Sequence, residues 1–148
     1  MKPSIFLRNC FFLSVCFIYA ASCSKSSASK NNSSSINGAW QTSVWGGAND
    51  TADITISTAA GTGTMIYLSA GATATGFSVN EMIFANIASS ANGTFTAVGE
   101  YRYGQGGQNV GHANATLTLQ SNNTVLYVHY VEDAGTGITP PDYYWQRK

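Results

Sequence analysis

The chain has 148 residues, of which only 9% are charged: seven basic and seven acidic, with two histidines. Four of the basic residues precede residue 31, so the part from residue 37 carries three basic and seven acidic side chains, a net charge of −4. A domain this poor in lysine and arginine lacks the positive surface that nucleic-acid binding requires, and we therefore exclude nucleic acid as a partner.

The N-terminal segment has the pattern of a secretory signal. Two basic residues open the chain, an apolar run follows from Cys10 to Ala21, and small residues precede Cys23. A basic start, an apolar core of about a dozen residues and small residues at the cut are typical of a signal peptide. The run is shorter than the roughly 20 apolar residues of a membrane-spanning helix. Residues 1–22 are therefore predicted to be a signal peptide.

A cysteine as the first residue after such a cut resembles the lipobox of bacterial lipoproteins. In that family the thiol is acylated, so the resemblance implies that Cys23 carries lipid, palmitate among its acyl chains, and that the membrane is a partner. A plain secretory peptide with a chance cysteine is the alternative. Ser24 follows Cys23, so the aspartate that marks inner-membrane retention in enteric bacteria is absent. We therefore expect a cell-envelope protein of the outer membrane, and the side that the domain faces stays open.

The remaining chain divides into a tether and one domain. Residues 23–36, rich in Ser, Lys and Asn, predict a lipidated cysteine with a flexible tether. Residues 37–148 are enough for one domain with one core. Cys10 and Cys16 leave with the signal peptide and Cys23 carries lipid, so the domain has no cysteine for a disulfide, a metal or a nucleophile.

The domain reads as strands and turns, because apolar and polar residues alternate and no ten-residue window keeps a helical spacing. In the segment 94–103, for example, Phe95 and Tyr101 share one face while Glu100 and Arg102 share the other. The predicted strands are 38–45, 51–58, 64–69, 77–87, 94–103, 112–120, 124–132 and 142–147. Eight strands with short connections predict an all-β fold, an antiparallel eight-stranded up-and-down barrel. A two-sheet β-sandwich fits the same pattern and is the alternative.

Three residues near the ends of the domain carry a family resemblance. Gly38-Ala39-Trp40 resembles the Gly-x-Trp start of the lipocalin and avidin group of barrels, the calycins, and Arg147 stands near the end of the last predicted strand. In those proteins the tryptophan closes the barrel floor and the arginine packs over it. The resemblance implies a lipocalin-like barrel closed by Gly38, Trp40 and Arg147. With no second lipocalin motif, the chain is closer to the small lipocalin-like domains of bacterial lipoproteins.

The sequence offers little for catalysis or metal binding. The chain has two histidines, His112 and His129, but no Gly-x-Ser-x-Gly motif that would supply a nucleophilic serine for them to activate. The acids form no pair suited to glycoside hydrolysis. His129 is interpreted as a half-buried histidine near a strand end rather than a pocket base. A hairpin folded about Asn122 would allow a contact between His112 and Glu132. These two side chains are fewer than the three or four ligands that a metal site needs. We predict no enzyme, no catalytic residue, no metal site and no cofactor.

Glu81 is the acid with most functional interest. It shares parity with apolar residues from Phe77 to Ile83, and inside a barrel its carboxylate could orient a ligand. The alternative is a bulge or a reversed parity, because Met82 and Phe84 make the other face apolar too.

We expect non-catalytic binding of a small apolar or amphipathic ligand in the barrel. The residues expected to face it are Glu81, Phe95, Tyr101, Tyr103 and Tyr127. The alternative is a structural or protein-interaction module of the cell envelope, with a barrel filled by its own side chains. Small interior residues opposite large ones would indicate such packing, and a ring of small residues around an open mouth would indicate a ligand.

Overall fold

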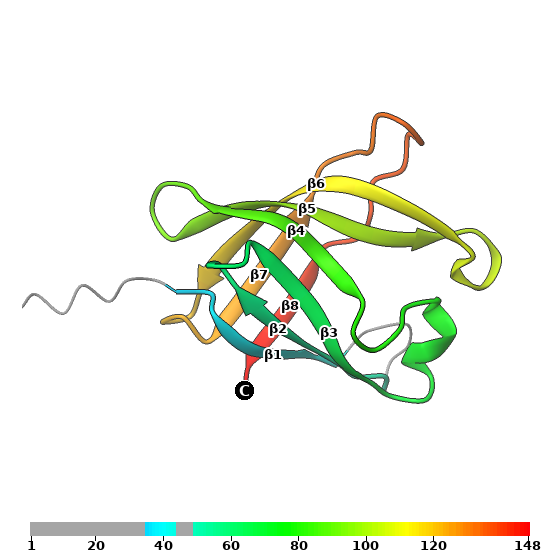
Figure 1. Ribbon diagram of the computed structural model, residues 1–148, viewed down its shortest axis with the longest axis horizontal. Coiled ribbons are helices and arrows are strands. Elements are labelled where there is room, and N and C mark those ends of the chain that lie inside the picture. The colour runs from blue at the N-terminus through cyan, green and yellow to red at the C-terminus, as the bar shows by residue number, and fades with distance from the viewer. Residues whose placement is uncertain (1–34, 44–48) are drawn as a thin grey trace, which may run out of the picture. The chain divides into compact units, whose positions relative to one another are not determined.

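A computed structural model describes residues 35–43 and 49–148; the predicted signal peptide and Cys23 lie outside the described residues. Eight antiparallel strands form a closed barrel in which each strand pairs with its neighbours in sequence and the last returns to the first (Figure 1). The strands are β1 (Gly38–Thr42), β2 (Ala52–Ser57), β3 (Thr62–Leu68), β4 (Met82–Ser89), β5 (Thr94–Tyr103), β6 (Asn109–Gln120), β7 (Val125–Tyr130) and β8 (Tyr143–Arg147). The helices in the described part are two short 3-10 turns, η1 (Ala72–Thr75) and η2 (Gln105–Gly107), and none is long and apolar enough to cross a membrane. The predicted up-and-down barrel is confirmed over the sandwich.

The strand faces follow the alternation in the sequence. Along β6, alternate residues from Gly111 to Leu117 are buried, and Phe95 on β5 pairs with Leu117 on that same face. The β6–β7 turn has three successive residues with positive φ, Ser121, Asn122 and Asn123. Asparagine tolerates this left-handed conformation better than most residues, which sets the hairpin centre where the sequence predicted it.

The fourth strand was predicted at 77–87, but β4 starts later than predicted and contains a bulge. Asn80 has φ of 71° and a turn bond joins Glu81 N to Ser78 O, so the strand starts only at Met82. Met82 is paired with Thr64 and Phe84 with Gly63, which leaves Ile83 as an extra residue. Ile83 and Phe84 are consequently both buried while Met82 is 49% exposed.

The barrel interior is filled by pairing large side chains with glycine. A Cβ atom on Gly63 would lie 2.8 Å from the Phe84 ring, and one on Gly111 would lie 2.2 Å from the Tyr101 ring. The largest fully buried side chains are Trp40 and Trp145. This is the small-opposite-large arrangement that indicates a packed barrel.

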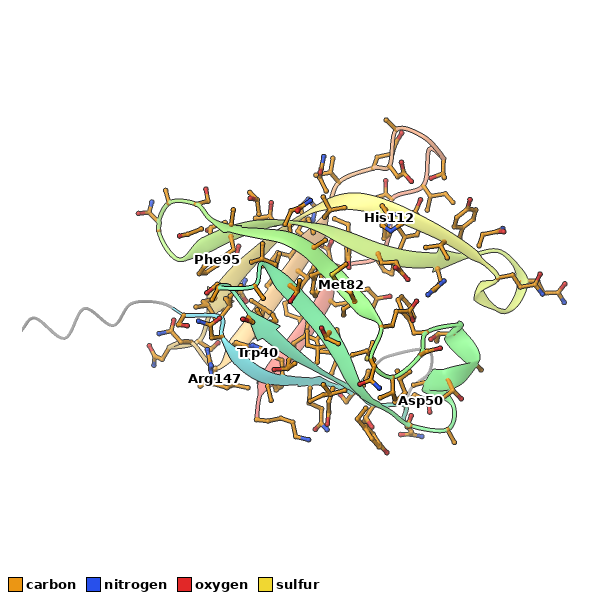
Figure 2. The ribbon with its side chains drawn as sticks, in the orientation of Figure 1. Trp40, Asp50, Met82, Phe95, His112 and Arg147 are labelled. Atoms are coloured by element: carbon orange, nitrogen blue, oxygen red, sulfur yellow. The ribbon has the colours of Figure 1, made fainter. Side chains whose placement is uncertain are left out.

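One end of the barrel is closed by Trp40 and Arg147, which lie together in Figure 2. The Arg147 guanidinium carbon is 4.2 Å from the centroid of the Trp40 ring. Arg147 also donates hydrogen bonds to the carbonyl oxygens of Ser35, Asn37 and Asn123. Gly38, with φ of 116°, runs beneath the guanidinium. The three residues therefore meet as the calycin resemblance implied.

Candidate ligand-binding site

A pocket of about 370 Å³ lies at the opposite, open end of the barrel. Three connections meet there, namely the β3–β4 segment with η1, the β5–β6 tip with η2, and the β7–β8 loop, all at the right of Figure 1. The lining residues are Ala74, Thr75, Phe77, Glu100, Tyr101, Arg102, Gly104, Gly106, Gly107, Ile138, Thr139, Pro140, Pro141 and Tyr143. Its size falls within the range of small-molecule sites, roughly 300–1,000 Å³.

Arg102 is held between two carboxylates at this pocket. Its Nη2 forms an ion pair with Glu81 and another, at 2.6 Å, with Oε1 of Glu100. Its guanidinium carbon also lies 4.9 Å from the centroid of the Phe77 ring, a cation–π contact. The second carboxylate oxygen of Glu100 is 3.8 Å from Nε2 of the exposed His112. Glu81, Glu100 and Arg102 are called the mouth cluster below.

The mouth cluster is poorly hydrated and incompletely hydrogen bonded. Burial raises the pKa of Glu100 above its ordinary value and lowers the pKa of Arg102. Within the described part of the chain, Glu100 Oε1 and Arg102 Nε are buried without a hydrogen-bond partner, so the contact between Glu100 and Arg102 is ionic rather than a well-aligned hydrogen bond. Unsatisfied buried polar atoms are uncommon and are expected where a ligand supplies the missing partner.

Glu81 reaches Arg102 because of the bulge in β4. Its carbonyl oxygen accepts the Met65 amide at 2.8 Å, which attaches this residue to the end of β3. Its Oε2 accepts the Ser78 amide at 2.7 Å while Oε1 contacts Arg102. The carboxylate is therefore oriented from both sides at the open end.

Tyr101 fastens the β7–β8 loop over the pocket. Its hydroxyl donates to Asp133 Oδ2 at 2.7 Å and lies 2.6 Å from Thr136 Oγ1. The Tyr101 bond, followed by the Gly135 amide, lowers the pKa of Asp133. Asp133 in turn bridges to Ile138, the residue at which the loop joins the pocket wall. The loop segment of the pocket thus has a defined position.

Two tyrosines lie close to the pocket. The rings of Tyr130 and Tyr143 pack edge to face, with centroids 6.3 Å apart. Burial, followed by the proximity of Tyr143 and Glu100, raises the pKa of Tyr130, and burial also raises the pKa of Tyr143. Both phenols stay neutral at physiological pH, so this side of the site is aromatic and uncharged.

The predicted ligand-facing residues lie in four different places, with Tyr127 apart from the others on the outer surface. Glu81 and Tyr101 lie at the open end. Phe95 lies near the other end of β5, packed in the core against Leu117, and Figure 2 places it toward the closed end. Tyr103 packs at the edge of the core, with its ring 5.7 Å from that of Tyr101.

Tyr127 does not face inward, contrary to the prediction. It alternates with the buried Leu126 and Val128 and lies on the outer surface, where its hydroxyl donates to Asp142 at 2.5 Å. His129 Nδ1 is 3.0 Å from the same carboxylate. His129 thus belongs to an exposed cluster outside the barrel and does not lie in the pocket. The alternation of side chains along β7 was predicted correctly, but the face that carries Tyr127 was taken as the inner one.

The contact between His112 and Glu132 that the sequence allowed is replaced by another. Ala115 pairs with Tyr130, one residue from the Ala115–His129 pairing that a hairpin centred on Asn122 would have. His112, however, pairs with Glu100 across the β5–β6 ladder and makes its ion pair there. In residues 35–43 and 49–148, no three His, Cys, Asp or Glu side chains gather in a way that could hold a metal ion.

The sequence analysis missed Glu100, Arg102 and the wall formed by residues 138–141. Glu100 and Arg102 were recognised as the polar face of one strand, which is the usual pattern of a solvated surface. One signal in the sequence could have drawn attention to this pair. Arg102 is the one basic residue between residues 31 and 146, so an arginine there is unusual for this chain.

Comparison with protein-family models, with curated proteins and with solved structures finds no match for this chain. The functional argument therefore depends on the geometry of the open end. The likeness to calycins depends on Gly38, Trp40 and Arg147 and on the barrel itself.

Proposed function

We propose that this protein is an exported, lipid-anchored and non-catalytic binding protein that takes a small amphipathic ligand at the open end of its barrel. The observation that carries the proposal is the pocket of about 370 Å³, which combines apolar walls with the partly buried mouth cluster. Ligand sites commonly pair apolar surface with a few oriented polar groups. The proposal places the ligand at the mouth, because packed side chains fill the barrel below it.

The walls suit an amphipathic molecule. Ile138, Pro140 and Pro141 offer apolar surface from the β7–β8 loop, and Phe77 and Tyr143 add aromatic rings. The charged groups come from the β5–β6 hairpin. A ligand with one apolar and one polar end would satisfy both parts of the pocket.

The anchor is proposed from residues outside the described part of the chain. Lipid on Cys23 would tie the domain to the outer membrane, and 14 residues, 24–37, separate it from the start of β1. The barrel could then bind a ligand close to the membrane surface.

Native mass spectrometry of residues 24–148, purified from bacterial cells, tests the binding proposal. This segment contains the whole described barrel. A bound mass that is lost on denaturation supports the proposal and identifies the ligand. Ala74→Trp, which fills the pocket from η1, should abolish the bound mass, whereas Ala88→Trp on an exposed site of β4 should keep it.

The anchor has a separate test in the full chain. Cys23→Ala should remove the acyl mass and release the protein from the membrane fraction, while Cys16→Ala should leave both unchanged. Membrane attachment that survives Cys23→Ala would contradict the lipid anchor.

The packed interior favours a second candidate, a protein-interaction module without a ligand. Gly63 and Gly111 lie directly against the rings of Phe84 and Tyr101, which is the arrangement of a solid barrel. A clean apo mass, together with no thermal shift on adding lipids, haem or sugars, would favour this candidate.

A further inference from the structure

The charges around the open-end pocket do not cancel. Of the described residues that line the pocket, Glu100 and Arg102 alone carry a formal charge at neutral pH. Glu81 adds a second carboxylate to the same guanidinium. With two negative groups and one positive group, the mouth cluster retains one negative charge.

This residual charge is concentrated at Glu100. Its side chain is only 14% exposed, and Oε1, which lies 2.6 Å from Arg102 Nη2, has no well-aligned hydrogen bond within the described residues. A carboxylate withdrawn from water is costly unless a partner compensates it. Burial accordingly raises the pKa of Glu100.

No other fixed positive charge is available to the site from the described residues. Arg147 is bound over Trp40 at the closed end, and Lys148 is paired with Asp53 at 2.6 Å. His112 approaches Glu100 from the exposed surface, with its Nε2 3.8 Å from the carboxylate, and does not line the pocket. The phenols of Tyr130 and Tyr143 have raised pKa values and stay uncharged.

An anionic ligand would find poor complementarity here. Its one attractive group would be Arg102, which already contacts two carboxylates. A cationic group would instead meet Glu100 with aromatic rings nearby, and ammonium groups are attracted both to carboxylates and to ring faces.

We propose that the ligand of this pocket is an ammonium amphiphile, with its cationic end at Glu100 and its apolar end against the loop residues Ile138, Pro140 and Pro141. This inference rests on the proposed function, because it names the chemical class of ligand for the same pocket. Selectivity between cation and anion is set by the mouth cluster, and the apolar wall accepts the hydrocarbon part.

Three probes with the same chain length separate charge from hydrophobicity: octylammonium, 1-octanol and octanoate. Calorimetric titration of residues 24–148 at pH 8 keeps octylammonium charged and imidazoles neutral. We expect octylammonium to bind at least about tenfold more tightly than 1-octanol, with octanoate the weakest.

Glu100→Gln should reduce the preference for octylammonium over 1-octanol to within about twofold. Glu132→Gln, at an exposed acid outside the pocket lining, is the matched control and should keep the preference. Near-ultraviolet circular dichroism establishes that each variant is folded. If Glu100→Gln does not fold, Glu81→Gln removes one charge from the same cluster and should weaken the preference.

The outcomes distinguish the two proposals. Equal binding of octylammonium and 1-octanol to the unmodified sequence, or tighter binding of octanoate, overturns the cation inference while leaving a ligand-binding pocket. A preference that persists unchanged in both Glu100→Gln and Glu81→Gln also overturns it. If no probe binds and native mass spectrometry finds no bound mass, both the inference and the proposed function fail.

Discussion

The ring of Tyr130 lies so close to Gly99 that a Cβ atom on that glycine would come within 2.4 Å of the Tyr130 Cε1 atom. Tyr130 belongs to β7 and Gly99 to β5, so the ring reaches across β6, where Ala113 and Ala115 are its small neighbours. A large side chain can therefore cross the barrel interior because three positions beneath it are alanine or glycine. This relationship makes the interior sensitive to single methyl groups.

Gly99→Ala should destabilise the barrel by about 1–3 kcal/mol, the usual cost of overpacking a filled core. Urea unfolding measures the change. Gly135→Ala is the control, because its added Cβ would meet at 3.3 Å only the end of the Asp133 side chain. Adding Tyr130→Leu to Gly99→Ala should recover part of the loss. A Gly99→Ala protein as stable as the unmodified one would show that the ring can move aside.

Arg147→Ala should lower the free energy of unfolding by about 1–3 kcal/mol. It removes the cation–π contact with Trp40 and the hydrogen bonds to three carbonyl oxygens, which join the closed end of the barrel. Arg147→Lys keeps the charge but cannot reproduce the planar donor set, so most of the loss should remain. Full stability in Arg147→Lys would mean that charge alone closes this end.

Tyr127 should titrate unusually late for an exposed tyrosine. Its hydrogen bond to Asp142, followed by burial, raises the pKa to about 12. The difference between the ultraviolet titrations of the unmodified protein and Tyr127→Phe isolates this phenol. Asp142→Asn should return the pKa toward the ordinary value near 10. Because the folded-state pKa is raised, the stability from this bond is complete below about pH 10 and is lost as the pH rises toward 12. An unchanged titration in Asp142→Asn would contradict the assigned cause.

Glu100 should make the protein less stable as pH rises. Burial raises its folded-state pKa above the ordinary value of 4.5, so just above pH 4.5 the unfolded state releases its proton more readily than the folded state. Stability attributable to Glu100 therefore falls as the pH rises from 4.5 through the raised value. Urea unfolding across this range should show a flatter profile for Glu100→Gln. The lowered pKa values of Asp133 and Asp142 act below 3.8, outside this window. Parallel profiles would contradict the prediction.

Local patterns predicted much of the fold. Alternation along β5 and β6 placed Phe95 and Leu117 on the buried face because a strand has a period of two, and the Asn122 turn set the register of the next hairpin. The contact between Trp40 and Arg147 followed from a family resemblance, since nothing local joins residues at opposite ends of a domain.

The candidate site was only partly predictable. Glu81 could be recognised as an acid among apolar residues, but its partner Arg102 depends on the extra residue Ile83, which redirects the chain before β4. Tyr127 shows the complementary difficulty, because a strand with large residues on both faces does not reveal which face is inside. Pocket walls formed by loops, such as residues 138–141, depend on tertiary contacts that periodicity does not contain.

The closure of the barrel between β1 and β8 has a consequence for folding. Every other strand pairs with its neighbour in the chain, so these hairpins can form early from local contacts. The β1–β8 ladder joins Trp40 to Arg147 and Gln41 to Gln146, residues more than 100 positions apart in the sequence. Until this ladder forms, both β1 and β8 present unpaired edges that can accept a strand from another copy. Pairing of β8 with β1 is therefore the step that closes the barrel and removes the edges at which strand exchange between molecules would start.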